Sequence, residues 1–242
     1  MMAPTLCLHW KPYAVCCNLT HRSHPSRLRP HTEAFDMAIT RARAKRPRRS
    51  ALLPQRLTLH AAIDDIDPAI CRTLSISERT TLPQLHRVLQ VVFGWYDMHL
   101  HMFTVGEVRY AEASEEDDFG LRTRDSATVS LSDLSLEVGS TFAYEYDFGD
   151  SWCITLTVED IAPEIDPQFP PIPLVLEGER AGPPEDCGGA PGYERLLAAL
   201  RAPETAEGKE MLEWLDVPFD PERYDLRTAR HALTMSYAWG AI

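Results

Sequence analysis

The sequence Tyr144-Glu-Tyr-Asp-Phe-Gly-Asp-Ser-Trp152 decides the fold, because it joins two apolar strands through a turn that contains glycine. Every second residue on each side of the turn is apolar: Phe142, Tyr144, Tyr146 and Phe148, then Trp152, Ile154, Leu156 and Val158. A two-residue loop would place the two apolar sets on opposite faces of the sheet, since a slip of one residue reverses every side chain. A three-residue loop, 149–151, buries both sets together. We therefore predict an antiparallel hairpin that pairs Phe148 with Trp152 and Tyr146 with Ile154.

The segment before this hairpin predicts the order strand, strand, helix, hairpin. Apolar residues alternate over 57–63 and again over 70–76, which is typical of half-buried strands. A helix follows, in which Thr81 and Gln84 match a capping box and Gly94 suits the C-terminal cap. This order predicts an α+β fold with a mixed or antiparallel sheet, packed helices and a β-grasp-like opening.

The loop Gly106-Glu107 has glycine first, which suits a two-residue hairpin that pairs Val105 with Val108 and Phe103 with Tyr110. Further along, an amphipathic helix is predicted from its apolar stripe of Tyr193, Leu196, Leu197 and Leu200. A short helix is expected over 210–215, and Asp220-Pro221 fits the N-cap and first residue of another.

Charge divides the chain into two parts. Residues 1–56 contain eleven Lys and Arg against two Asp and Glu, whereas the remainder contains thirteen basic and thirty-four acidic residues. We expect residues 1–54 to be a disordered basic extension, residues 55–228 to form the domain, and residues 229–242 to be a C-terminal tail. The extension is either a nucleic-acid-binding arm, through its basic residues 41–49, or a dispensable leader, with Met37 as the initiator.

Composition limits the class of protein. The chain is 44% hydrophobic and 25% charged, as in ordinary globular proteins, and it contains no apolar run long enough to cross a bilayer. Its six cysteines lack paired spacing, which argues against a disulfide framework and a zinc finger. We therefore expect a cytoplasmic protein with no membrane partner.

Acidic and aromatic residues gather in two segments and are the binding candidates: Tyr146, Asp147, Asp150, Trp152, Glu185 and Asp186. An acidic groove with exposed aromatic rings suits a basic peptide or protein through charge complementarity and cation–π contact. For Asp150 the alternative is a purely structural role, as an acceptor for backbone N–H groups of its own turn. His86 lies next to the apolar stripe of its helix and is expected to be a partly buried neighbour rather than a ligand.

Several motifs together resemble the plasmid pRiA4b Orf3-like family over roughly residues 55–228. They are Leu85-His-Arg-Val-Leu-Gln90 with Gly94-Trp95, His99-Leu-His-Met-Phe103, Tyr144–Asp150 with Trp152, Gly178-Glu-Arg180, Pro183–Gly189 with Gly192-Tyr193, and Phe219-Asp-Pro-Glu222. The resemblance implies an α+β domain from plasmids, mobile elements and bacterial chromosomes, with no known biochemical role. Some members are labelled transposon passenger or resolvase-like, but the arginine set that a recombinase needs is missing here.

Members of that family tend to have histidine at the position of Ile154 and cysteine at the positions of Val175 and Gly182. The resemblance therefore implies a His/Cys site for a soft metal that this chain has largely lost. The remaining metal candidates are His99, His101 and Cys187, with the two histidines on one face of a strand.

Three functions stay open. The first, which the sequence favours, is a non-enzymatic binding module, because no nucleophile–base pair, phosphate loop or complete metal set can be named. The second is a metal-dependent hydrolase or nuclease that uses the acids or the histidines. The third is a DNA-associated factor of mobile elements that acts through the basic extension.

Overall fold

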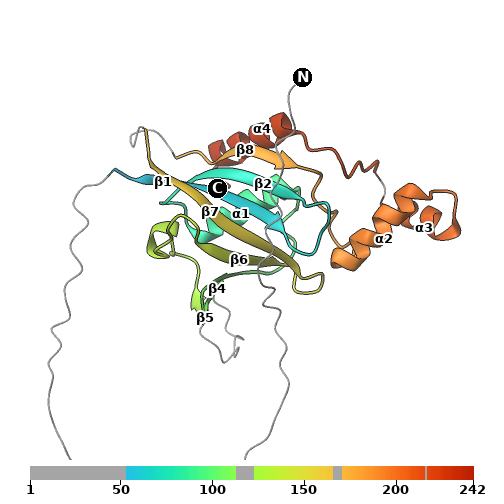
Figure 1. Ribbon diagram of the computed structural model, residues 1–242, viewed down its shortest axis with the longest axis horizontal. Coiled ribbons are helices and arrows are strands. Elements are labelled where there is room, and N and C mark those ends of the chain that lie inside the picture. Colours follow the sequence, from blue (N-terminus) through green and yellow to red (C-terminus); the bar gives the residue numbers. More distant parts are fainter. Residues whose placement is uncertain (1–52, 113–122, 166–170, 216) are drawn as a thin grey trace, which may run out of the picture. The chain divides into compact units, whose positions relative to one another are not determined.

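The computed structural model describes residues 53–112, 123–165, 171–215 and 217–242. Residues 1–52, which include the basic residues 41–49, lie outside the described residues, so the interpretations of the N-terminal extension stay predictions. Helices and strands within the described part form one unit around one core (Figure 1).

The sheet has eight strands in the order β5-β4-β3-β6-β7-β1-β2-β8. Every pairing is antiparallel except that of β4 with β5, so the sheet is mixed and the predicted α+β class is confirmed. The strands are β1 (Gln55–Ile63), β2 (Cys71–Ser77), β3 (His101–Val105), β4 (Val108–Ala111), β5 (Thr123–Asp125), β6 (Thr141–Tyr146), β7 (Trp152–Pro163) and β8 (Leu174–Glu179). The expected opening order of strand, strand, helix and hairpin is present.

Helix α1 (Leu82–Phe93) begins and ends where its caps require. The Thr81 side chain accepts from the Gln84 amide, the Gln84 side chain accepts from the Thr81 amide, and Gly94 ends the helix with a φ of 82°. Its apolar stripe is buried against the face of the sheet that also carries Leu59, Leu74 and Ile154. The hairpin of β3 and β4 has the predicted register, with Phe103 opposite Tyr110 and Val105 opposite Val108.

The register predicted for the central hairpin is wrong by two residues. Tyr146, not Phe148, lies opposite Trp152, and Tyr144 lies opposite Ile154. The loop therefore runs from Asp147 to Ser151, which both have positive φ. The predicted loop of three residues and the observed loop of five residues are both odd in length, so both bury the two apolar sets together. In the longer loop Phe148 is no longer part of the strand, and it is 44% exposed.

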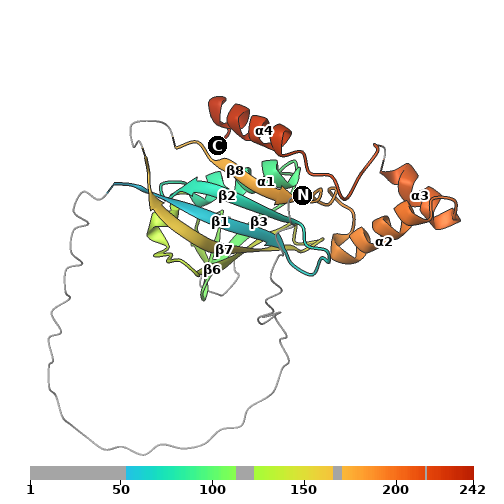
Figure 2. The ribbon, with the colours of Figure 1, turned by 45° about the horizontal axis from the view of Figure 1, so that its top comes forward.

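The C-terminal third adds three helices: α2 (Gly189–Arg201), α3 (Ala206–Trp214) and α4 (Leu226–Ala238). Helix α2 packs against α3, and α4 lies along the edge strand β8 in both views (Figures 1 and 2). The predicted helix start at Asp220-Pro221 is wrong, because Asp225 is the N-cap of α4 and accepts from the Thr228 amide. Helix α4 continues past residue 228 and places Leu233 in the core.

A buried arginine connects four of these segments. Arg72 of β2 donates from Nε to the Val92 carbonyl of α1, and from Nη1 to the carbonyls of Cys71 and Glu179. Its guanidinium also lies 3.8 Å from the ring centroid of Tyr224, just before α4. Burial lowers the pKa of Arg72 to about 10. Backbone carbonyls and an aromatic face, rather than a carboxylate, therefore hold this cation.

No helix among the described residues is both long and apolar enough to cross a membrane.

Candidate functional site

Three loops that are far apart in sequence meet at one end of β3 and β6. They are the segment 95–100 after α1, the turn 147–151 between β6 and β7, and the segment 183–189 before α2. Hydrogen bonds connect each to the others: Trp95 Nε1 donates to the Pro183 carbonyl, the Asp147 amide to the Leu100 carbonyl, and the Gly188 amide to Asp150 Oδ2. We call these segments the three site loops.

The aromatic half of the predicted binding surface is wrong. Tyr146 is 0% exposed and Trp152 is 2% exposed, so neither ring can meet a partner. The Tyr146 ring stacks on Trp95 at 4.9 Å, its hydroxyl accepts from the Met98 amide, and it donates to Glu185 Oε1. Burial raises the pKa of Tyr146, which keeps the hydroxyl protonated as this donor. Both aromatics support the site from inside the core.

The two aspartates of the turn have different structural roles. Asp147 Oδ1 accepts from the Gly149 amide at 2.9 Å, which is the bond within the turn that the sequence suggested for Asp150. Asp150 reaches the other loop instead, where Oδ2 accepts from the Gly188 amide at the start of α2. The end of α2 that could have held an external anion is therefore occupied by the protein's own carboxylate.

The structure brings His99 together with three of the predicted acidic residues. His99 Nε2 lies 3.0 Å from Asp186 Oδ1, 3.6 Å from Asp147 Oδ2 and 4.0 Å from Glu185 Oε2. The ligand atoms of His99, Asp147 and Asp186 all lie within 4.8 Å of one another. We call His99, Asp147, Glu185 and Asp186 the His/acid group. Each of the three site loops contributes at least one member.

A second histidine lies in a closed network that the sequence did not predict. Gln90 Nε2 donates to the Tyr144 hydroxyl, and Gln90 Oε1 accepts from the Asp97 amide. His86 lies 2.7 Å from the Tyr144 hydroxyl through Nδ1 and 2.7 Å from Asp97 Oδ1 through Nε2. A carboxylate only accepts, so Nε2 carries the proton and Nδ1 of the neutral ring accepts from Tyr144. Burial lowers the pKa of His86, although Asp97 opposes this shift.

His101 stacks on His86, with ring centroids 3.5 Å apart and an angle of 5° between the planes. Burial, followed by the neighbouring His86, lowers the pKa of His101 to about 4. Its Nε2 is buried and has no hydrogen-bond partner among the described residues. His101 therefore belongs to the network of His86 and is not a member of the His/acid group.

Cys187, the third metal candidate, does not join either histidine. Its side chain is buried, and burial raises the pKa of its thiol to about 12. A thiol that stays protonated is a poor metal ligand, because the thiolate is the binding form.

A cavity of about 660 Å³ opens beside these histidines, next to the part of β3 that extends beyond the end of β4. Volumes of this size are typical of small-molecule sites. Three carboxylates and two guanidinium groups line it, with apolar side chains between them. The lining includes His86, Arg87, Asp97, His99, Leu100, His101, Met102, Arg109, Glu112, Glu145 and Phe148.

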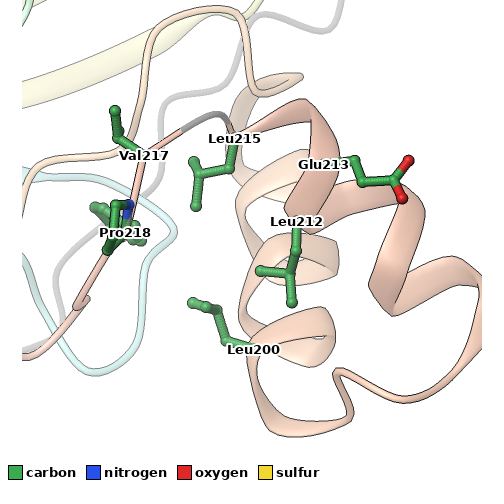
Figure 3. Close-up of a pocket in the computed structure, with 7 residues that line it drawn as sticks. Leu200, Leu212, Glu213, Leu215, Val217 and Pro218 are labelled. Atoms are coloured by element: carbon green, nitrogen blue, oxygen red, sulfur yellow. The ribbon is translucent and has the colours of Figure 1, made fainter.

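A second cavity, of about 550 Å³, lies between the end of α2 and the segment after α3. Leu200, Leu212 and Leu215 line it together with Val217, Pro218 and Phe219, while the Glu213 carboxylate points away from the leucines (Figure 3). Its described lining contains no histidine or cysteine and is mostly apolar.

The sequence named every member of the His/acid group but missed the partnership of His86, Gln90 and Asp97. One signal was present, because His86 and Gln90 are four residues apart and therefore lie on one face of α1. The position of Asp97 depends on a positive φ of 58° in the following loop, which no periodicity reveals.

The three positions at which the family resemblance implied histidine or cysteine do not form one site. Ile154 of β7 and Val175 of β8 are separated by β1 and β2, which corresponds to roughly 14 Å at the usual strand spacing. Both side chains are buried in the core. A Cβ at Gly182 would lie 1.9 Å from the Phe93 carbonyl oxygen, so this backbone has no room for cysteine there.

Comparison with known proteins finds a family model and similar proteins in two kinds of search, of sequences and of solved structures. The family model described as plasmid pRiA4b ORF-3-like protein matches residues 55–228. The uncharacterized protein y4hQ of Sinorhizobium fredii (strain NBRC 101917 / NGR234) is 33% identical over 157 residues, which is 64% of this chain and 78% of y4hQ. The crystal structure of a protein of unknown function, MM3350 of Methanosarcina mazei Go1, is similar with a TM-score of 0.65 and 32% identity. The match covers 73% of this chain and 97% of MM3350.

Proposed function

This chain belongs to the plasmid pRiA4b ORF-3-like protein family, and on that premise we propose that it is a cytoplasmic binding module whose partner is a basic, partly apolar peptide segment. The observation that carries the proposal is a group of exposed apolar side chains beside the acid-lined cavity. Tyr96, Met98 and Leu100 project from one site loop and Phe148 from another, and all four are exposed. Exposed apolar residues that gather in this way are typical of interaction sites.

The charge of the cavity supports a basic partner. Asp97, Glu112 and Glu145 line it against Arg87 and Arg109, and the acidic members of the His/acid group lie beside it. Complementary charge increases both the rate and the specificity of binding. The aromatic rings available for cation–π contact are Tyr96 and Phe148, in place of the buried Tyr146 and Trp152.

Fluorescence anisotropy of a labelled peptide of alternating lysine and leucine, titrated with the full chain, tests the proposal. We expect Leu100→Ser to weaken binding roughly tenfold, because a leucine side chain that becomes buried on binding contributes about 1.5 kcal/mol. Leu174→Ser is the matched control, since Leu174 is exposed on the edge strand β8 away from the cavity.

Charge is tested in the same assay. Glu145→Gln should weaken binding and reduce its salt dependence, whereas Glu177→Gln on β8 should not. Equal affinity of the wild type and all four variants, or equal affinity for a peptide of alternating glutamate and leucine, would contradict a basic partner.

Metal-dependent hydrolysis is a second candidate, favoured by the position of His99. This residue lines the cavity and also belongs to the His/acid group. A water activated by a metal ion at that group would therefore face a molecule bound in the cavity. Incubating the full chain with DNA and Mg²⁺ or Mn²⁺ tests this candidate. Cleavage that is lost in His99→Gln would favour hydrolysis over simple binding.

The third candidate, a DNA-associated factor of mobile elements, depends on residues 41–49 and therefore on a segment outside the described residues. A gel-shift assay that compares the full chain with a variant lacking residues 1–50 tests it. The acidic charge of the remaining chain predicts that no DNA binding survives the deletion.

A further inference from the structure

We propose that His99, Asp147 and Asp186 bind a divalent transition-metal ion, Zn²⁺ in preference to other metals, with Glu185 beside them. This site goes beyond peptide binding and does not depend on it. The two are separable because peptide binding can be measured in the presence of a chelator.

The distances match a small coordination polyhedron. Bonds of about 2.1 Å from Zn²⁺ to nitrogen and oxygen place the ligand atoms of a tetrahedron about 3.4 Å apart. The observed distances from His99 Nε2 are 3.0 Å to Asp186 Oδ1 and 3.6 Å to Asp147 Oδ2. The two aspartate oxygens lie within 4.8 Å of each other. Small side-chain adjustments would therefore complete the geometry.

Two buried polar atoms in the group lack hydrogen-bond partners among the described residues. They are His99 Nε2 and Glu185 Oε2, which face each other at 4.0 Å. The contact of Nε2 with Asp186 is short, but its angle is not that of a hydrogen bond. Glu185 is only 11% exposed, so leaving its oxygen unsatisfied costs free energy. A cation between these atoms would satisfy both.

Two of the three carboxylates, those of Glu185 and Asp147, are already held in place through their other oxygen. Glu185 Oε1 accepts from the Tyr96 amide and the Tyr146 hydroxyl, and Asp147 Oδ1 accepts from the Gly149 amide. Each carboxylate is thereby oriented with one oxygen toward His99. Outer hydrogen bonds of this kind are typical of metal sites, where they fix the direction of the ligands.

Charge also favours a metal over a plain ion pair. A protonated His99 with three carboxylates would leave a net charge of −2, whereas Zn²⁺ with a neutral His99 leaves −1 in the same small volume. The imidazole ligand argues against Ca²⁺ and Mg²⁺, which prefer oxygen throughout, and the lack of a thiolate argues against softer ions.

The experiment is a zinc titration of the full chain, purified without an affinity tag and treated with a chelator, in which bound metal is counted by elemental mass spectrometry and affinity is measured by calorimetry. The first 31 residues include four histidines and three cysteines that can bind zinc independently, so the result is the difference between variants. We expect the wild type to bind one more equivalent than Asp186→Asn and His99→Gln, or to bind it roughly 10- to 100-fold more tightly.

Asp160→Asn and His231→Gln are the matched controls, because both residues are exposed and lie outside the group. Asp186→Asn keeps the test valid even if His99→Gln fails to fold, since the Asp186 side chain is 68% exposed and contributes little to the core. Equal stoichiometry and affinity in the wild type, Asp186→Asn and Asp160→Asn would overturn the site.

Discussion

Replacing Gly182 by alanine should destabilise the protein far more than an ordinary glycine substitution. The added Cβ would lie 1.9 Å from the Phe93 carbonyl oxygen and 2.8 Å from the Phe93 carbonyl carbon. These are backbone atoms at the buried end of α1, so no side-chain rotation can relieve the overlap. Either α1 or the segment that leads to Glu185 must move by about 1 Å or more, at a cost of roughly 3 kcal/mol.

The neighbouring Gly94→Ala variant separates this overlap from the loss of glycine itself. Gly94 has a φ of 82°, but a Cβ there meets nothing within 4 Å, so its cost is only the left-handed conformation, about 1 kcal/mol. Urea unfolding followed by tryptophan fluorescence gives both values. A Gly182→Ala variant no less stable than Gly94→Ala would refute the close packing of α1 on this loop.

Three further outcomes follow from the site. The folded pKa of His101, about 4, lies below its ordinary value of 6.5, so the unfolded chain binds more protons between these values. Stability should therefore fall by up to roughly 3 kcal/mol as the pH drops from 6.5 toward 4, and urea titrations of His101→Gln should show a shallower loss than the wild type. Tyr146→Phe should cost about 1–3 kcal/mol, because it leaves the Met98 amide and a Glu185 oxygen without this hydroxyl; an unchanged melting temperature would contradict the network. Asp150→Ala should cost about 1 kcal/mol and increase amide exchange at Gly188, and unchanged exchange there would count against the bond between the loops.

Features set by neighbouring residues could be predicted from the sequence. The caps of α1 and the register of the β3–β4 hairpin depend on side chains a few positions apart, and both predictions are confirmed. The need to bury both apolar sets also predicted correctly that the central loop has an odd number of residues. This argument cannot distinguish a loop of three residues from one of five. The longer loop depends on the positive φ of Asp147 and Ser151 and on the bond from the Gly149 amide to Asp147.

The candidate site could be predicted only in its residue types. The acids and His99 were chosen because such residues are dense in these segments. Their convergence depends on hydrogen bonds between loops that lie roughly 40 to 90 residues apart in the sequence. Alternation already placed Tyr146 and Trp152 on the buried face of the hairpin, and the structure agrees with it; the mistake was to assign the same two rings to a binding surface. Their neighbour Trp95 lies against both rings from a third loop.

The contacts of Arg72 predict that one part of the core resists acid. Most buried cations are neutralised by carboxylates, and such pairs fail when acid protonates the carboxylate. The guanidinium of Arg72 instead depends on three carbonyl oxygens and the Tyr224 ring, none of which gains a proton in moderately acidic solution. The junction of α1, β2 and β8 should therefore outlast the His/acid group during acid denaturation, and a partly unfolded acid state would keep the sheet edge while it loses the site loops.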